Sequence, residues 1–292
     1  MDEKVLAPTL RTIAGRLAPG GGFAQKPDTP FRADATAWAI LALGTCGDQP
    51  RLVESARARL AGEQLSDGRV CLAKEYPHIS WSTSVASMAW NSNQAYAGNI
   101  RKACDFLLKY EGLTFQKSPT QPYAHNPSIP GWAWIDNTFS WIEPTTLSIL
   151  ALRKAGYGGH TRVSEGIRLL MDRQLSRGGW NYGNTVVYGN ELYAQTESTG
   201  LALSALAGQV DKKDIQRSLD YLKTQVVSSR TPLSLGWSIF GLSAWGQRPV
   251  QANKWIMECL SKQKIFGIYG TTLLSLLVLA YSSDSGFLET IS

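Results

Sequence analysis

Three acidic residues occupy equivalent positions in a repeated block of this 292-residue chain. Asp34, Glu143 and Glu197 each stand two residues before a threonine, at the beginning of a mostly apolar segment. A carboxyl group in a recess can donate or accept a proton, and two carboxyls can divide these tasks between them. A carboxylate near a helix start can instead bind the unpaired amides of the first turn or a neighbouring repeat. We therefore interpret these acids either as catalytic residues or as structural ones.

Tryptophan is the second residue type of interest, because ten are present and several stand close to these acids. Aromatic faces can stabilise a carbocation or enclose an apolar ligand, and they also pack between repeats. The expected ligand-binding residues lie near the acids or in two long connections, and they are Trp38, Trp81, Trp132, Trp134, Asp136, Trp141, Tyr193 and Trp237.

The two long connections precede two of the acids. Residues 114–140 are rich in Pro and Trp, and residues 181–195 contain three tyrosines. Long connections without a helix of their own are commonly lids or binding loops. We expect both to lie at the entrance of one ligand site.

Neither metal chemistry nor nucleic-acid binding is expected. The four cysteines are far apart, and the three histidines lie in connections without the spacing of metal ligands. The net charge is +6, but the basic residues are spread along the chain without a cluster. We expect no metal, no cofactor and no nucleic-acid partner.

The acids belong to a repeat that continues along the chain. The repeated block is a nearly all-apolar helix that starts with a small or acidic residue and Thr or Ser. It recurs at 33–47, 79–90, 142–156, 196–208, 235–246 and 270–281.

One-sided helical segments alternate with these blocks. Their apolar residues recur at helical spacing, and charged residues fill the remaining face. They are Glu3–Arg16, Arg51–Leu65, Asn99–Lys109, Thr161–Gln174, Lys212–Gln225 and Gln251–Gln263. An inner and an outer layer of helices explain the alternation, and closure avoids apolar end faces. The sequence predicts an all-α fold, a single α6/α6 barrel over residues 1–292 with about six helix pairs.

The joints between repeats are also patterned. Residues 64–70, 174–180 and 263–269 read Gln-x-x-x-Gly-x-apolar, and residues 17–23 are a version without Gln. Glycine at a helix end can adopt positive φ, and the following apolar or aromatic residue can pack one repeat against the next.

These joints resemble the Gln…Trp repeats of the squalene–hopene cyclase and oxidosqualene cyclase superfamily, whose α/α toroid is shared by protein prenyltransferase β subunits. Class II cyclases of that superfamily carry an Asp-x-Asp-Asp-Thr-Ala motif, and residues 32–37 match it as Arg-Ala-Asp-Ala-Thr-Ala. The resemblance implies the toroid fold and a general-acid role for Asp34, the counterpart of the middle acid. Arg32 replaces the first acid and favours an ionised Asp34.

Three functions follow from these observations. The first is a terpenoid cyclase- or prenyltransferase-like protein that binds a hydrophobic, isoprenoid-like molecule in a central aromatic cavity, with Asp34 as general acid. The second is a non-catalytic toroid subunit that binds a lipid or a partner protein. The third is an α/α-barrel carbohydrate-active enzyme that uses paired carboxylates.

The N-terminal residues begin with acids and lack the apolar stretch of a signal peptide. The longest apolar stretch, 273–281, is too short to span a bilayer. We expect a cytoplasmic protein whose contact with a membrane, if any, is peripheral.

Overall fold

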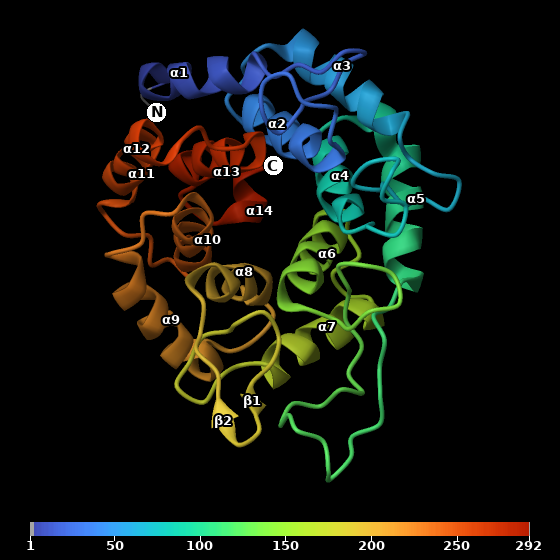
Figure 1. Ribbon diagram of the computed structural model, residues 1–292, viewed down its shortest axis with the longest axis vertical. Coiled ribbons are helices and arrows are strands. Elements are labelled where there is room, and N and C mark those ends of the chain that lie inside the picture. Colours follow the sequence, from blue (N-terminus) through green and yellow to red (C-terminus); the bar gives the residue numbers. More distant parts are fainter. Residues whose placement is uncertain (1–2, 292) are drawn as a thin grey trace.

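Six apolar helices form the inner ring of the computed structural model, which describes residues 3–291 (Figure 1). Each inner helix contacts the next, and the last contacts the first, so that the ring is closed. They are α2 (Ala33–Thr45), α4 (Ser82–Trp90), α6 (Ile142–Lys154), α8 (Thr196–Leu206), α10 (Pro232–Ser243) and α13 (Thr271–Ser282). They are buried nearly all round because an outer layer covers their backs.

The outer layer consists of one-sided helices that each bury a single face. In α7, for example, Val163, Leu169 and Leu170 are buried at helical spacing. The outer helices are α1 (Glu3–Ala14), α3 (Pro50–Ala61), α5 (Ala97–Lys109), α7 (Thr161–Asp172), α9 (Lys212–Val226) and α11 (Ala252–Ser261). The predicted all-α barrel of paired helices is confirmed.

Five short elements complete the described chain. A 3-10 helix, η1 (Gln94–Tyr96), leads into α5, and α12 (Gln263–Phe266) follows α11. The strands β1 (Val186–Val187) and β2 (Asn190–Glu191) pair antiparallel inside the connection before α8. The last helix, α14 (Phe287–Thr290), turns back toward the centre of the ring (Figure 1).

Phe287 of α14 closes the core of the ring. Its ring lies 5.5 Å from Trp38, 5.3 Å from Trp237 and 5.2 Å from Phe240, measured between ring centroids. All four side chains are nearly inaccessible to solvent. Edge-to-face and tilted contacts of this kind stabilise a core beyond simple burial. The aromatic side chains at the centre therefore pack on one another.

The joints between repeats have the predicted conformation. Gly21, Gly68, Gly178 and Gly267 all have φ between 87° and 96°. Two residues after the glycine, the backbone amide of Phe23, Val70 or Trp180 donates to a threonine hydroxyl of the next inner helix. The acceptors Thr36 and Thr199 are the threonines that follow Asp34 and Glu197 in the repeated block. The threonine of that block therefore has a structural role.

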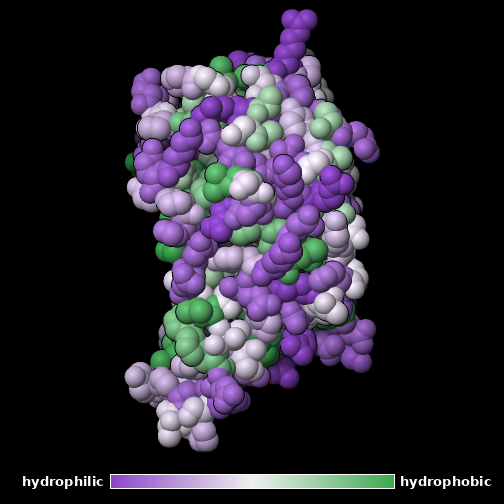
Figure 2. All heavy atoms as spheres, turned by 90° about the vertical axis from the view of Figure 1, so that its right-hand side faces the viewer, coloured by the Kyte–Doolittle hydropathy of each residue, from purple (hydrophilic) through white to green (hydrophobic). Residues whose placement is uncertain are grey.

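Figure 2 views the molecule from the side of α5 and shows a mostly hydrophilic surface, on which hydrophobic side chains gather toward the lower end. Within residues 3–291, no helix combines the length and apolar character that crossing a bilayer requires.

Candidate functional site at the inner helix starts

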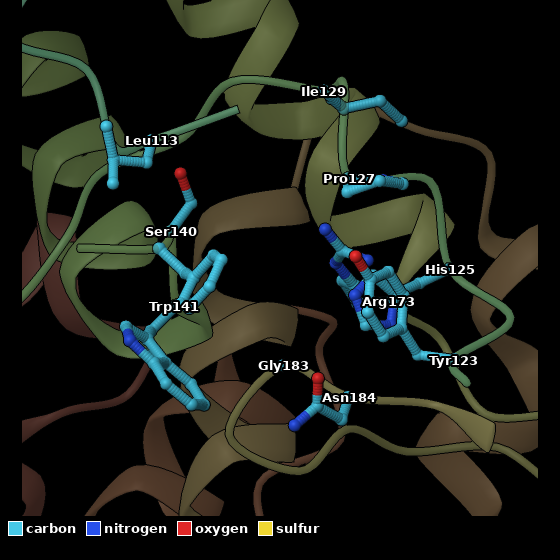
Figure 3. Close-up of a pocket in the computed structure, with 11 residues that line it drawn as sticks. Leu113, Tyr123, His125, Pro127, Ile129, Ser140, Trp141, Arg173, Gly183 and Asn184 are labelled. Atoms are coloured by element: carbon cyan, nitrogen blue, oxygen red, sulfur yellow. The ribbon is translucent and has the colours of Figure 1, made fainter. Parts of the chain in front are cut away.

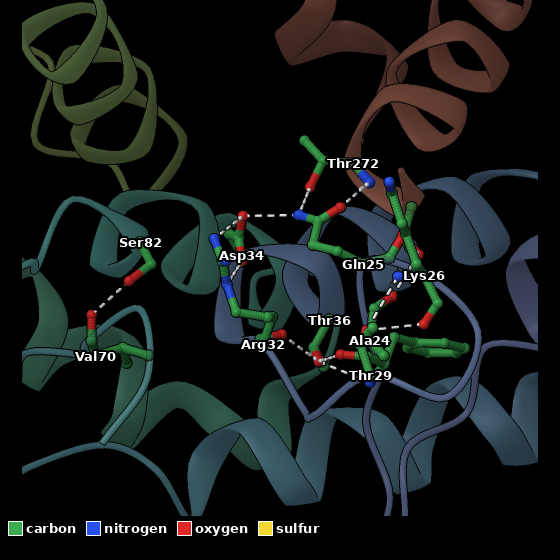
Figure 4. Close-up of polar contacts among 12 residues, drawn as sticks. Ala24, Gln25, Lys26, Thr29, Arg32, Asp34, Thr36, Val70, Ser82 and Thr272 are labelled. Carbon is green, nitrogen blue, oxygen red and sulfur yellow. Dashed lines mark hydrogen bonds and ion pairs between the residues drawn. The ribbon is translucent and has the colours of Figure 1, made fainter. Parts of the chain in front are cut away.

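Polar side chains join neighbouring inner helices where these helices begin. The amide of Gln25 donates to Asp34 Oδ2 at 2.9 Å and to Thr272 Oγ1 at 2.6 Å, linking the starts of α2 and α13 (Figure 4). The hydroxyl of Ser234 donates to Glu197 Oε2 at 2.7 Å, linking the starts of α10 and α8. The helix starts therefore meet at one end of the ring, where they carry a polar rim.

The side chain of Asp34 accepts N–H groups from two neighbouring residues. Arg32 Nε lies 3.0 Å from Oδ1, and Arg32 Nη2 lies 3.1 Å from Oδ2 (Figure 4). Gln25 supplies a third N–H, and the Asp34 side chain is only 5% exposed. Both oxygens of Asp34 are therefore already engaged as hydrogen-bond acceptors. Through Gln25 and Thr272, Asp34 makes the kind of contact between repeats that the structural interpretation expects.

Glu143 differs from Asp34, because its carboxyl is mostly surrounded by protein yet has no N–H donor of the described chain bound to it. Burial raises the pKa of Glu143, and the negative charge of Glu197 raises it further, to about 7. The side chain is nevertheless half-buried rather than sealed. Protein therefore surrounds most of the Glu143 carboxyl, while part of the side chain remains in contact with solvent. At neutral pH this group is present in both protonation states, as acid–base catalysis requires.

Glu197 is the partner of Glu143 on the neighbouring inner helix, and α6 contacts α8 directly. Ser234 fixes one oxygen of Glu197, and no described residue hydrogen-bonds the carboxyl of Glu143. Neither acid accepts a hydrogen bond from an amide of its own helix start within the described part of the chain. Helix capping therefore does not account for the two glutamates.

Four of the predicted aromatic residues remain accessible. Trp81 precedes α4 and makes an edge contact with Trp134, with ring centroids 5.2 Å apart. Both are half-buried, as is Trp141, which immediately precedes α6. Tyr193 is 87% exposed and stands in the connection before α8. These side chains lie where a ligand approaching the inner helix starts could touch them.

The remaining predicted aromatic residues belong to the core. Trp38, Trp132 and Trp237 are no more than 3% exposed. Trp132 Nε1 donates to the carbonyl of Leu107 at 2.9 Å, and the guanidinium of Arg162 lies 3.8 Å from the Trp132 ring centroid. Because no face of these three rings is free, their predicted ligand contacts are corrected to packing contacts.

Asp136 is engaged in holding its own loop. Its Oδ2 lies 3.0 Å from Arg69 Nη1 and 3.7 Å from His78 Nδ1, and its backbone amide donates to the carbonyl of His78 at 3.0 Å. These contacts tie the long connection before α6 to the connection before α4. The structure thus favours a positioning role for Asp136.

A cavity of about 220 Å³ lies between the two long connections (Figure 3). Trp141 lines it, and so do several residues that the sequence analysis missed, namely Tyr123, His125, Arg173 and Asn184. The unusual length of the two connections predicted that residues within them contribute to a ligand site. Nothing in the pattern singled out Arg173, which follows an ordinary one-sided helix.

Among the residues described, no group of three or more His, Cys, Asp or Glu side chains is arranged to hold a metal ion. Of the acids at the helix starts, Asp34 accepts N–H groups and Glu197 accepts the Ser234 hydroxyl, while Glu143 interacts electrostatically with Glu197.

No protein-family model matches this chain, and no curated protein sequence matches it. Solved structures do. The α-1,6-mannanase of Salegentibacter matches with a TM-score of 0.66 at 12% identity, over 96% of this chain and 98% of that one. A novel α-amylase of Clostridium perfringens matches with a TM-score of 0.62 at 10% identity, over 96% and 97% of the two chains.

The type II terpene cyclase MstE of Scytonema also matches, with a TM-score of 0.59 at 13% identity, over 92% of this chain and 82% of that one. At such identities the likeness concerns the fold alone. The chain has the α/α toroid fold, which terpene cyclases and glycosidases both use.

Proposed function

We propose that this protein is a carbohydrate-active enzyme in which Glu143 is the general acid and Glu197 is its partner carboxylate. The observation that carries the proposal is the raised pKa of Glu143, about 7, caused by burial and by the charge of Glu197. Two carboxyls whose environments separate their proton affinities are the usual acid and base of glycoside cleavage.

The reaction consistent with this pair is hydrolysis of a glycosidic bond. Glu143 donates its proton to the leaving oxygen while the bond from that oxygen to the anomeric carbon breaks. Glu197 either removes a proton from the attacking water or attacks the anomeric carbon itself. Water supplies the hydroxyl of the new reducing end, and Glu143 regains its proton.

The weak acidity of Glu143 argues against the hypothesis of an isoprenoid substrate. Protonation of an alkene needs a much stronger acid than a carboxyl that titrates near pH 7. Asp34, the residue that the resemblance would make the proton donor, is bound by Arg32 and Gln25. Trp38 and Trp237, expected to line a cavity for a polyene, pack on Phe287 instead.

The polar rim and the accessible aromatic side chains fit a sugar. Hydroxyl-rich ligands need hydrogen-bonding groups, which Ser234 and the two glutamates provide. Trp81, Trp134 and Trp141 offer partly exposed aromatic faces. The mannanase with the same fold also supports the proposal, since an inactive variant of it was solved with α-1,6-mannotriose.

The test is hydrolysis of a panel of α- and β-linked oligosaccharides, followed through the appearance of reducing ends. We expect Glu143→Gln and Glu197→Gln each to lower the rate by at least about a hundredfold while folding is retained. The matched control is Glu75→Gln, because Glu75 is an exposed glutamate away from the site. Full activity in Glu143→Gln would eliminate the proposed general acid.

A second candidate function, a toroid subunit for a partner protein, rests on a separate observation. Ile265, Phe266 and Ile268, in and after α12, are 62–77% exposed. Neighbouring apolar side chains this exposed commonly mark contact surfaces. Phe266→Ser should abolish co-purification of a stoichiometric partner from the native host. Loss of vesicle binding instead would assign the cluster to a membrane surface.

A further inference from the structure

The cavity between the two long connections is separate from the glutamate pair. Leu113, Ser140 and Trp141 form one wall, and Tyr123, His125 and Arg173 lie opposite them (Figure 3). Its volume of about 220 Å³ suits a small molecule rather than a polymer. Neither Glu143 nor Glu197 lines it.

Arg173 is a buried cation whose donors are only partly used. The residue is 5% exposed, and its Nη2 donates to the carbonyl of Asn126 at 3.2 Å. Its Nε and Nη1 have no hydrogen-bond partner among the described residues. Burial lowers the pKa of Arg173 to about 10, so that it remains charged at neutral pH. A buried cation with unused N–H groups is costly unless something else pairs with it.

Asp172, the ion-pair partner of Arg173, also accepts a backbone hydrogen bond. Asp172 Oδ2 lies 3.3 Å from Arg173 Nη1 without the alignment of a hydrogen bond, and it accepts the backbone amide of Asn126 at 2.9 Å. Asp172 does not line the cavity, and no lining residue is acidic. Arg173 thus presents a positive charge at the cavity wall, while its ion-pair partner Asp172 lies outside the lining.

Two further polar groups lie at the same cavity. The Nδ1 atom of His125 is buried without a hydrogen-bond partner in the described chain, and its ring stacks on Tyr123 at 4.5 Å between centroids. The carboxamide of Asn184 is drawn toward the cavity from the opposite connection (Figure 3). The rest of the lining is mostly apolar, with Leu113, Ile129 and Trp141 among it.

We propose that this cavity binds a small organic carboxylate, with the carboxylate group on Arg173 and its aromatic or short aliphatic body against Leu113, Ile129 and Trp141. A single guanidinium pairs well with one carboxylate. The apolar walls gain from covering a hydrocarbon body. Binding would also join the two long connections, because each supplies lining residues.

The competing explanation is that Arg173 only anchors its loop through Asn126 and Asp172. The two explanations differ in a measurable way. An anchor needs no ligand, whereas a binding site distinguishes a charged probe from a neutral one of the same shape.

The experiment is calorimetric titration of the whole protein with phenylacetate and, separately, with phenylacetamide. We expect phenylacetate to bind at least about tenfold more tightly, which corresponds to about 1.4 kcal/mol. Hexanoate and 3-phenylpropionate extend the series to aliphatic and longer bodies. Absence of binding by all three carboxylates, or equal affinity for the acid and its amide, would overturn the proposal.

Two variants test the location without removing the arginine. Leu113→Trp fills the cavity from a position that is 44% exposed, and Asn184→Asp places a negative charge opposite Arg173. Both should weaken phenylacetate binding by at least about tenfold while the melting temperature changes little. The matched control is Leu65→Trp, at a leucine that is 47% exposed outside the cavity. Unchanged binding in Leu113→Trp would place the ligand elsewhere.

Discussion

Glu143 and Glu197 occupy the same position near the starts of adjacent inner helices, and the charge of Glu197 helps to raise the pKa of Glu143 to about 7. The repeat places the two carboxyls in equivalent positions, and the contact between α6 and α8 in the closed ring brings them close enough to interact electrostatically. Neither the repeat nor the ring alone would produce this electrostatic coupling between the two glutamates. Their combination is what lets the charge of Glu197 act on Glu143.

The coupling predicts the effect of removing one charge. In Glu197→Gln the pKa of Glu143 should fall, because a source of repulsion is lost, but it should stay above 4.5, because burial is the larger cause. Carbon-detected NMR titration of glutamate-labelled protein would measure it. Glu165→Gln, a change on outer helix α7, should leave the value unchanged, and an unaltered pKa in Glu197→Gln would contradict the coupling.

The same carboxyl predicts how stability varies with pH. Between the ordinary pKa of 4.5 and about 7 the folded protein holds a proton that the unfolded chain releases. The free energy of unfolding therefore decreases as pH rises through this interval, by about 3 kcal/mol for this group. Glu143→Gln stays neutral, so its stability relative to the native protein should be higher at pH 8 than at pH 4. Urea unfolding at the two pH values measures the difference, and a pH-independent difference would refute the assignment.

Asp34 should matter for stability rather than for turnover. Asp34→Asn breaks the ion pair with Arg32 and alters the contact with Gln25. We expect a loss of about 1–3 kcal/mol in the free energy of unfolding. The exposed Asp220→Asn is the comparison, with a change below about 0.5 kcal/mol. Loss of activity in a stably folded Asp34→Asn protein would restore the general-acid hypothesis.

Phe287 is expected to contribute strongly to the core of the ring. Phe287→Ala removes its contacts with Trp38, Trp237 and Phe240 and leaves a void. Substitutions of this type typically cost about 3–5 kcal/mol. Thermal unfolding with calorimetry measures the loss. Phe266→Ala, at a site that is 72% exposed, should cost far less, and equal effects would show that α14 does not seal the core.

The glycine of the joint pattern should not tolerate a side chain. At Gly178, φ is +92°, and an added Cβ would lie 2.5 Å from the carbonyl carbon of Arg217. Gly178→Ala should therefore cost more than about 2 kcal/mol in chemical denaturation. Gly47 also has positive φ, but no atom lies within 4 Å of its added Cβ, so Gly47→Ala should cost about 1 kcal/mol. Similar losses at both positions would show that close packing at the joint is unimportant.

The helix pairs could be predicted because they depend on local pattern. The inner segments are apolar nearly all round and the outer segments on one face, which is how two concentric layers bury their residues. The joint glycines were predictable for a similar reason, since their positive φ is a local backbone requirement.

The roles of the acids and tryptophans depended on the tertiary structure. By sequence alone, Glu143 and Glu197 are equivalent, Asp34 differs from them through its neighbour Arg32 and its match to the cyclase motif, and Trp38 looks as accessible as Trp81. Arg32 and Gln25 donate hydrogen bonds to Asp34. No described residue donates one to Glu143, whose pKa is raised by burial and by the charge of Glu197. Trp38 is buried because α14 returns to the centre of the ring. Sequence thus determined the helices, their repeat and the local Arg32–Asp34 pair. The burial of Trp38 and the raised pKa of Glu143 were decided by segments distant in the sequence, since packing and charge act through space.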